Sequence, residues 1–439
     1  MCFVALRKSQ ELTDSSKDPY VILREEMLEA TMVHPSHDAR LMTLSLLITS
    51  PSTSRPYSVK AIALLRKHIS AFFAEPDARF RVELLGKIRE MYKRVRGAIF
   101  TLARSIKRAK NKSIKDYLPE HTSPNVGDSL QPTFFRANLV DLPEPLLIHC
   151  HSYHIAFLQW YVSLLREELI PTASYQRHVA ALKGLQGILK MESRSVNPWS
   201  SPDDREFFFD IFDVTWRRIL FDLIMDPYED IRNLAAEAVG LLIVDSRFRH
   251  FGSIHSPSAS LVNSFGHVSD FQARAMNIAR RTARADHANG AARSCQLFYR
   301  FALHGTERLE LLTDLVEQLK RMISLAEADL GNAVLDAPLH GHIAAVSYTW
   351  QYASTTPFSE PDLTAVGLLE AEVVSCCSRI WHAVRQVLCD DSPEGHIPQE
   401  LEDIDGLDTK DLLSFSFRAI HESRFVYSRA VRFNATNSS

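Results

Sequence analysis

The chain has 439 residues, a net charge of −3 and 46% hydrophobic residues; this composition excludes a disordered protein and allows more than one compact domain. Only 15 residues are Gly, so tight turns and phosphate-binding glycine loops are scarce and the composition favours an all-helical class. The six cysteines show no Cys-x-x-Cys spacing and no run of 18 apolar residues occurs. We therefore expect a reduced, cytoplasmic protein without a membrane segment.

Apolar residues spaced by three and four predict helices along most of the chain, and no alternating strand pattern is found. Segments rich in Pro, Ser and Gly, and one acidic segment, separate the helical blocks. The predicted order is helical repeats at 1–110, a loop or insert at 111–141, helical repeats at 142–244, a loop at 245–267, helical repeats at 268–390, an acidic loop at 391–408, and a last segment at 409–439.

The first block contains a predicted basic helix at 79–110. Thirteen Lys or Arg and only two Glu lie between Arg79 and Lys115, a local net charge of +11. At 100° per residue, the apolar positions form one stripe and the cations gather on the opposite side. The cationic residues of this helix and of the segment after it are Arg89, Lys93, Arg96, Arg104, Lys107, Arg108, Lys110, Lys112 and Lys115. A solvated helix face usually alternates its charges, so this pattern favours binding to an RNA phosphate backbone.

Three helix starts resemble one another: "HDARLMTLSLLI" at His37, "YQRHVAALKGLQGI" at Tyr175 and "EDIRNLAAEAVGLLI" at Glu229. Each places an Arg near the start of a stripe rich in Ala and Leu. An acidic first turn suits the helix dipole, and the Arg is expected to bridge to a neighbouring repeat. This arrangement is typical of HEAT and armadillo repeats. It predicts an all-α fold, an α-solenoid of stacked antiparallel helix pairs, over one closed bundle.

Motifs for chemistry are weak. "HCHSYH" at 149–154 offers three imidazoles, but no second ligand pair lies near in sequence, so packed histidines are favoured over a zinc site. "GDSL" at 127–130 would place a nucleophile at Ser129, but its flanks predict a loop without the strand that such chemistry needs. No phosphate-binding loop occurs. We expect no catalytic residue, metal, cofactor or small-molecule substrate.

Several blocks carry a family likeness. They are "SHDARLMTLSLLITSPSTSRP", "FFAEPDARFRVELLGKIREMYKRVRGA", "IPTASYQRHVAALKGLQGIL", "DPYEDIRNLAAEAVGLLI" and "LDTKDLLSFSFRAIHES". In this order they resemble the middle of the thyroid adenoma-associated protein family. In the last block Phe417 stands where the family usually has Trp. An arginine-pair motif of the family's C-terminal domain is absent, so the resemblance leads us to expect a fragment of a longer protein, with 409–439 as the start of that domain.

The resemblance implies a long helical-repeat protein without catalytic activity. Its implied partners are a tRNA 2′-O-ribose methyltransferase and tRNA, because family members assist modification of a cytidine in the anticodon loop. Two other functions are considered. A general HEAT-repeat adaptor would bind proteins and no RNA, and a hydrolase would use Ser129.

Overall fold

The computed structural model describes residues 25–50, 52–115, 143–193, 214–244, 257–282, 284–302, 305–336, 339–353, 358–389 and 406–437. Within these ranges all regular secondary structure is helical, and the predicted all-α helical-repeat fold is confirmed. The chain forms two compact units, Met1–Asp213 and Val214–Ser439. No helix among the described residues is long and apolar enough to span a bilayer.

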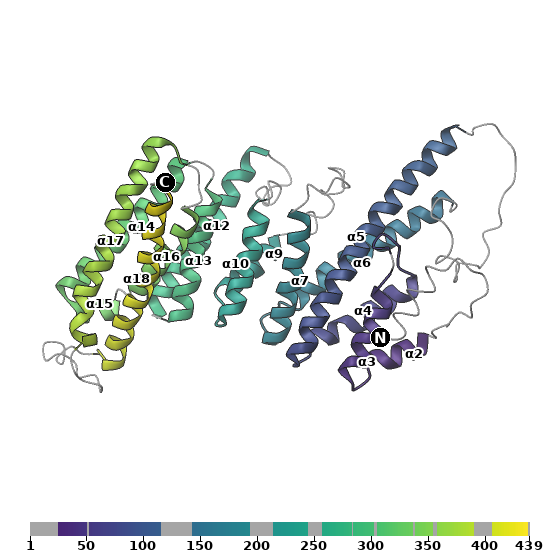
Figure 1. Cartoon of the computed structure of the whole chain (residues 1–439), viewed down its shortest axis with the longest axis horizontal. Coiled ribbons are helices and arrows are strands. Elements are labelled where there is room, and N and C mark those ends of the chain that lie inside the picture. Colours follow the sequence, from purple (N-terminus) through teal and green to yellow (C-terminus); the bar gives the residue numbers. More distant parts are fainter. Residues whose placement is uncertain are drawn as a thin grey trace. The chain divides into compact units, whose positions relative to one another are not determined.

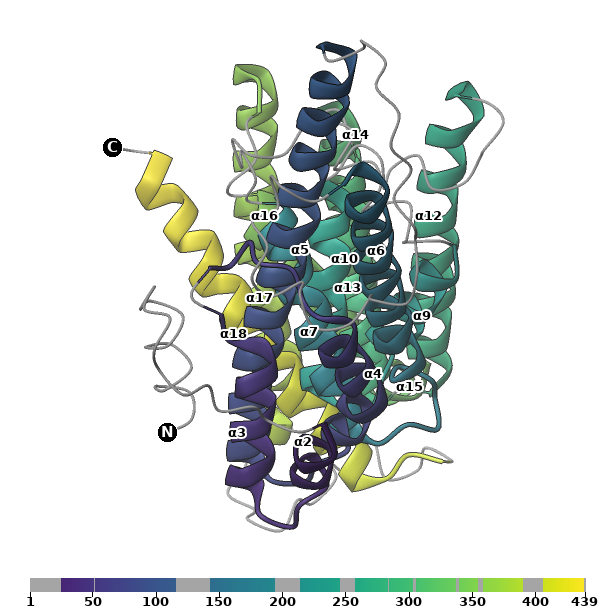
Figure 2. The same cartoon turned by 90° about the vertical axis from the view of Figure 1, so that its right-hand side faces the viewer.

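The helices of unit 1 (Figure 1) are α2 (Glu25–Met32), α3 (His37–Ile48), α4 (Val59–Phe73), α5 (Ala78–Lys115), α6 (Glu144–Glu167) and α7 (Tyr175–Ser193). The long helix α5 is central to this unit, because it packs against α3, α4, α6 and α7. Figure 2 shows α3 and α5 side by side. The predicted basic helix at 79–110 thus ends five residues later, at Lys115, inside the segment predicted as a loop at 111–141.

The helices of unit 2 are α9 (Val214–Ile224), α10 (Glu229–Val244), α12 (Pro257–Thr282), α13 (Ala285–Phe301), α14 (Gly305–Ala328), α15 (Leu330–Asp336), α16 (Leu339–Ala353), α17 (Glu360–Cys389) and α18 (Thr409–Asn437). An extended apolar core of this unit joins α13, α14, α16, α17 and α18, around buried residues such as Trp350 and Val373. Helix α12 begins inside the segment predicted as a loop at 245–267. Pro257 occupies its first position, where a missing N–H and a fixed φ are favourable, although the Ser-rich sequence is typical of loops.

Two of the three arginines at the similar helix starts bridge helices in unit 1. Arg40 of α3 donates to Glu75, which follows α4, with 2.7 Å between Nη2 and Oε2. Arg177 of α7 donates to Glu168, just after α6, with 2.8 Å between Nη1 and Oε2. The Glu168 side chain is buried, and its other oxygen accepts from Ser70 of α4 at 2.6 Å. Each arginine therefore links the start of one helix to the end of another.

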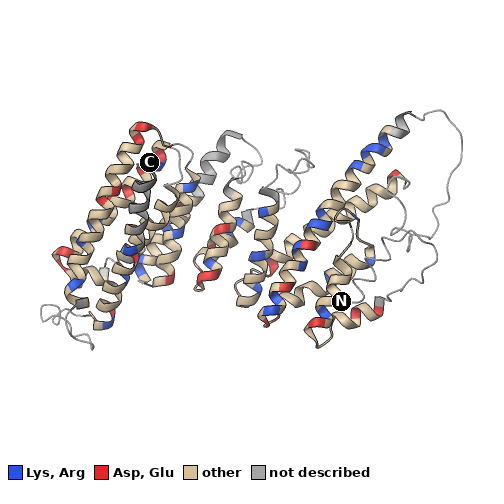
Figure 3. Cartoon of the chain, in the orientation of Figure 1, with Lys and Arg blue, Asp and Glu red and all other residues tan. Residues whose placement is uncertain are grey.

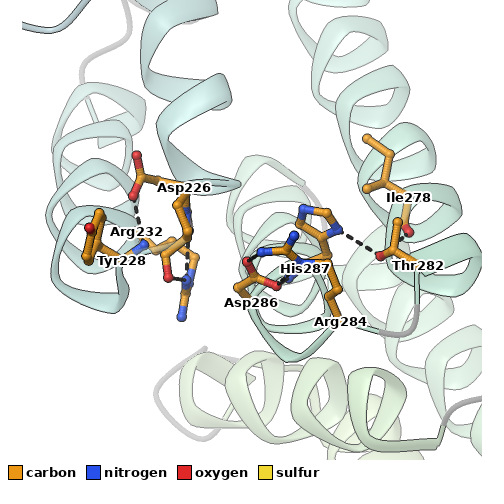
Figure 4. Close-up of polar contacts among 9 residues, drawn as sticks. Asp226, Tyr228, Arg232, Ile278, Thr282, Arg284, Asp286 and His287 are labelled. Atoms are coloured by element: carbon orange, nitrogen blue, oxygen red, sulfur yellow. Dashed lines mark hydrogen bonds and ion pairs between the residues drawn. The ribbon is translucent and has the colours of Figure 1, made fainter. Parts of the chain in front are cut away.

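The third arginine, Arg232 of α10, is buried and connects three helices of unit 2. Its Nη1 donates to the carbonyl oxygens of Asp226 and Pro227, in the turn after α9, at 2.7 and 2.9 Å (Figure 4). Its Nε donates to Oδ1 of Asn289 in α13 at 3.0 Å. Buried carbonyls need such donors, so Arg232 stabilises the turn and the packing of the next helix together.

Gly97 allows the segment before α4 to approach α5. A Cβ at position 97 would overlap the carbonyl oxygen of Thr53 and lie 3.2 Å from Cα of Ser54. These are backbone atoms, which cannot move as freely as the end of a side chain. The absence of a side chain at position 97 is therefore a packing requirement.

We expect Gly97→Ala to destabilise unit 1 by about 1–3 kcal/mol, because overpacking against backbone outweighs the better helix propensity of Ala. Gly86→Ala is the matched control: it lies in the same helix, and nothing lies within 4 Å of its added Cβ. That control should stabilise the helix by up to about 1 kcal/mol. Urea unfolding followed by circular dichroism measures both. Equal stabilisation by the two substitutions would contradict the close approach at Gly97.

Candidate nucleic-acid interface

Helix α5 begins where local sequence signals place it. The Asp77 carboxylate accepts the backbone N–H of Phe80 at 2.7 Å and so caps the first turn. This hydrogen bond holds the pKa of Asp77 below its ordinary value. No Pro occurs in the 38 residues that follow, and the many Leu, Lys and Arg residues are good helix formers. The apolar stripe lies against the core, as predicted: Leu84, Ile88, Met91, Val95, Ile99 and Leu102 are buried and Ile106 is half-buried.

The predicted cationic residues lie on the opposite side of α5. Arg96 is half-buried, while Arg89, Lys93, Arg104, Lys107, Arg108 and Lys110 are exposed. Lys112 and Lys115 belong to the last turns of the helix, and their side chains lie outside the described part. The structure thus brings the first seven together on one face, which we call the α5 cationic face. Figure 3 shows Lys and Arg gathered toward the C-terminal end of this helix.

Few carboxylates accompany this face. Glu83 and Glu90 are the acidic residues of α5, and Glu90 pairs with Lys87 at 3.2 Å. Among the described residues, no ion pair involves Arg89, Lys93, Lys107, Arg108 or Lys110. The Arg104 guanidinium lies 5.3 Å from the centre of the Phe100 ring, one turn earlier. Cations near a helix C-terminus also suit the helix dipole, but the dipole acts only over the last turn, and the face begins at Arg89.

One cation of α5 has a structural role that the charge pattern did not reveal. Arg94 is 4% exposed. Its Nε donates to the carbonyl of Arg55 at 2.9 Å and its Nη1 to that of Ile48 at 2.8 Å. It also donates to the carbonyls of Leu47 and Pro56, at 3.3 and 3.2 Å. Its guanidinium carbon lies 4.0 Å from the centre of the Tyr57 ring. Arg94 thus holds the end of α3 and the segment before α4 against α5, and is no part of the cationic face.

The histidines of "HCHSYH" do not share a site. His149 is exposed and His151 is half-buried. His154 is buried and uses both ring nitrogens: Nε2 accepts the Tyr57 N–H at 2.9 Å, and Nδ1 lies 2.8 Å from the Cys150 carbonyl oxygen. Its imidazole is occupied by backbone hydrogen bonds and offers no nitrogen to a metal. Across the described ranges, no group of three or more potential ligands suits a metal ion. Ser129 and residues 391–405 of the acidic loop lie outside the described residues.

Stability should fall in acid because His154 is held neutral. Burial lowers the pKa of His154 from its ordinary 6.5 to about 4, and the nearby charges of Arg94 and His151 act in the same direction. Between about pH 6.5 and 4, the unfolded chain binds a proton that the native chain does not, so stability rises with pH across this window and is lost as pH falls. The full shift corresponds to about 3 kcal/mol. Urea unfolding at pH 7 and 4.5 should show a smaller difference for His154→Gln than for the parent; an equal difference would contradict this cause.

Two protein-family models match parts of this chain. The family model described as Trm732, TPR repeats, matches residues 1–233, a region that includes all of unit 1 and therefore α5. The chain belongs to the Trm732 family. A second model, THADA/TRM732 DUF2428, matches residues 369–439 and so begins within α17. The resemblance to the thyroid adenoma-associated protein family is thereby confirmed.

One curated relative covers almost the whole of this Trm732-family chain. The tRNA (32-2′-O)-methyltransferase regulator trm732 of Schizosaccharomyces pombe (strain 972 / ATCC 24843) is 23% identical over 437 residues. The alignment covers 96% of this chain and 26% of that relative. The chain therefore spans about a quarter of the length of the relative.

Proposed function

We propose that this chain is a non-catalytic regulatory part of a tRNA 2′-O-ribose methylation system, acting in the cytoplasm. Its partners would be a methyltransferase specific for position 32 of tRNA and the tRNA itself. Support comes from the relative named as a regulator of such an enzyme and from the exposed α5 cationic face. A small methyltransferase has little surface for binding a substrate as large as tRNA. A helical-repeat protein can supply additional binding surface.

The observation that carries the RNA part of the proposal is the charge of α5. A face of at least six exposed cations, with two Glu in the whole helix, suits the phosphate backbone, which is the main source of affinity for nucleic acids. Phosphate contacts position an RNA without reading its sequence. The face would therefore hold tRNA, and the methyltransferase would choose the nucleotide.

Reconstitution tests the regulatory role. The chain is mixed with the tRNA (32-2′-O)-methyltransferase of the same organism and with unmodified tRNA, and methyl transfer to position 32 is measured by mass spectrometry. We expect faster transfer than with the enzyme alone, a complex of chain and enzyme in analytical ultracentrifugation, and no transfer by the chain alone. The control is an equal concentration of an unrelated helical-repeat protein. Unchanged transfer together with no complex would refute the regulatory role.

A general protein adaptor predicts a different result. Its α5 face would bind an acidic protein surface, and salt-dependent affinity for tRNA would be absent. Binding measured by filter retention across a salt series separates the two functions. If the chain increases methylation without binding tRNA, the regulatory role stands and the RNA contact by α5 is wrong.

A further inference from the structure

Helix α18, the last described helix, carries a face whose side chains are exposed to solvent. Lys410, Phe417, His421 and Arg424 are all exposed, and at 100° per residue they fall within one narrow arc. The opposite side of α18 is buried against α16 and α17, through Leu412, Phe415, Ala419 and Val426 among others. We call the four exposed residues the α18 aromatic face. Successive residues of this face are seven, four and three positions apart, so the face extends along about four turns of the helix.

Phe417 is the most unusual member of this face. Its side chain is 63% exposed, although large aromatic side chains of folded proteins are mostly covered. Its ring is stacked on the His421 imidazole, with 6.0 Å between ring centres and 25° between ring planes. The two rings therefore form a short stack on the helix surface, with much of the phenyl ring open to solvent.

Cations flank this stack. Lys410 lies seven residues before Phe417 and Arg424 seven residues after it, so each is about two helical turns away on the same face. Within the part of the chain that the structure describes, neither side chain forms an ion pair with a carboxylate. The acidic residues of α18 itself are Asp411 and Glu422, which lie toward one side of this face. Oε1 of Glu422 is 3.7 Å from Nδ1 of His421.

The composition of the face decides which partner fits it. A second helix or a second copy of the chain would need apolar residues at successive turns, and here one aromatic residue stands among three groups that are or can become cationic. Packing a helix on this face would bury those charges without partners, which is costly. An unpaired nucleic-acid strand fits better, because a base stacks on an aromatic ring while its neighbouring phosphates meet Lys and Arg.

We propose that the α18 aromatic face binds unpaired bases of an RNA loop, with Phe417 and His421 as the stacking surface and Lys410 and Arg424 as phosphate contacts. This inference rests on the proposed RNA-binding function and deepens it. The α5 cationic face would contact paired and unpaired RNA alike, whereas the α18 aromatic face selects unpaired nucleotides, such as those of a tRNA anticodon loop. Base pairing hides the ring faces of bases within the stack, so a duplex cannot use Phe417.

The test compares a fluorescently labelled 12-nucleotide single-stranded RNA with the duplex of the same sequence, by anisotropy across a salt series. Phe417→Ala should weaken single-strand binding by about tenfold, as expected for one lost base stack, and leave duplex binding unchanged. Because the phenyl ring carries no charge, the salt slope should also stay unchanged. Arg424→Gln should instead lower the single-strand slope by about 0.7.

Two control variants test whether single-strand binding requires an aromatic ring at position 417. Phe417→Trp keeps an aromatic ring and should retain or increase single-strand affinity. Leu368→Ala removes another exposed apolar side chain, 66% exposed on α17, and should change nothing, because an aliphatic group does not stack on bases in this way.

The other possible outcomes contradict the inference, and each identifies which part of it is wrong. If the parent binds neither RNA, the RNA-binding part of the proposed function and this inference both fail. If α5 charge reversal weakens RNA binding and Phe417→Ala does not, only the α18 aromatic face is wrong. An equal loss for single strand and duplex excludes stacking. If Phe417→Ala abolishes self-association in sedimentation velocity without changing RNA affinity, the face is a protein interface.

Discussion

Replacing Arg104, Lys107 and Arg108 together with Glu is expected to weaken tRNA binding by about 100-fold near physiological salt and to lower the salt slope of log affinity by about 2 to 3. Each exposed cation that meets a phosphate releases counterions, at about 0.7 to 0.9 of slope per contact, and reversal adds repulsion. Different tRNAs should be weakened about equally, because phosphates carry no base identity. Filter binding across a salt series measures affinity and slope together.

The matched control is a triple reversal of Arg218, Arg274 and Arg321, exposed residues scattered over α9, α12 and α14 of unit 2. It changes the net charge by the same amount without altering α5. If both triple variants lose the same affinity, the effect is one of overall charge. If neither differs from the parent, the α5 cationic face is a solvated helix surface.

Replacing Arg94 with Met should destabilise unit 1 by about 3 kcal/mol or more. The substitution keeps an unbranched apolar side chain but leaves four carbonyl oxygens without their cationic donor, and hydrogen bonds to charged groups contribute about 1.5–3 kcal/mol each before compensation. The contact with the Tyr57 ring is lost as well. Hydrogen exchange should increase in peptides covering the end of α3 and residues 52–58, because these segments are held by the same guanidinium.

Arg89→Met is the control for this prediction, since Arg89 is exposed on the same helix. It should change the free energy of unfolding by less than about 0.5 kcal/mol while weakening RNA binding slightly. The two substitutions separate a structural arginine from an interfacial one. If both variants lost similar stability, the hydrogen bonds of Arg94 to the four carbonyl oxygens would not be the cause of the loss.

Much of the fold was predictable because helical periodicity and start signals agree. Helix α10 begins and ends where the sequence predicted, at Glu229 and Val244. Acidic residues in its first turn and a long Ala- and Leu-rich stripe both indicate a helix over this segment. Helix α12 was less predictable. Its Ser, Asn and Gly residues favour loops in isolation, and its packing against α13 overrides that weak local preference.

The candidate interface was predictable in part. Charge and helical angle alone placed the seven described cations of the α5 face on one side. Helical angle alone did not separate Arg94 from the exposed cations, because this residue falls between Arg108 and the apolar stripe; its role is seen only in its contacts with four carbonyl oxygens. The position of Phe417 was not predicted, because an aromatic residue in an amphipathic helix is usually taken as core. Only the packing of α18 against α16 and α17 shows that its phenyl ring points away from the core.

The length of α5 sets a spatial scale for any partner. Beyond Ser105 no described side chain of this helix is buried, yet the helix continues to Lys115. At 1.5 Å per residue, the portion from Arg104 to Lys115 extends about 16 Å. A helical segment of that length would suit a continuous stretch of the proposed RNA backbone better than scattered contacts. If α5 binds RNA as proposed, shortening or kinking this segment, and not only neutralising its charges, should reduce the number of phosphates that it contacts at once.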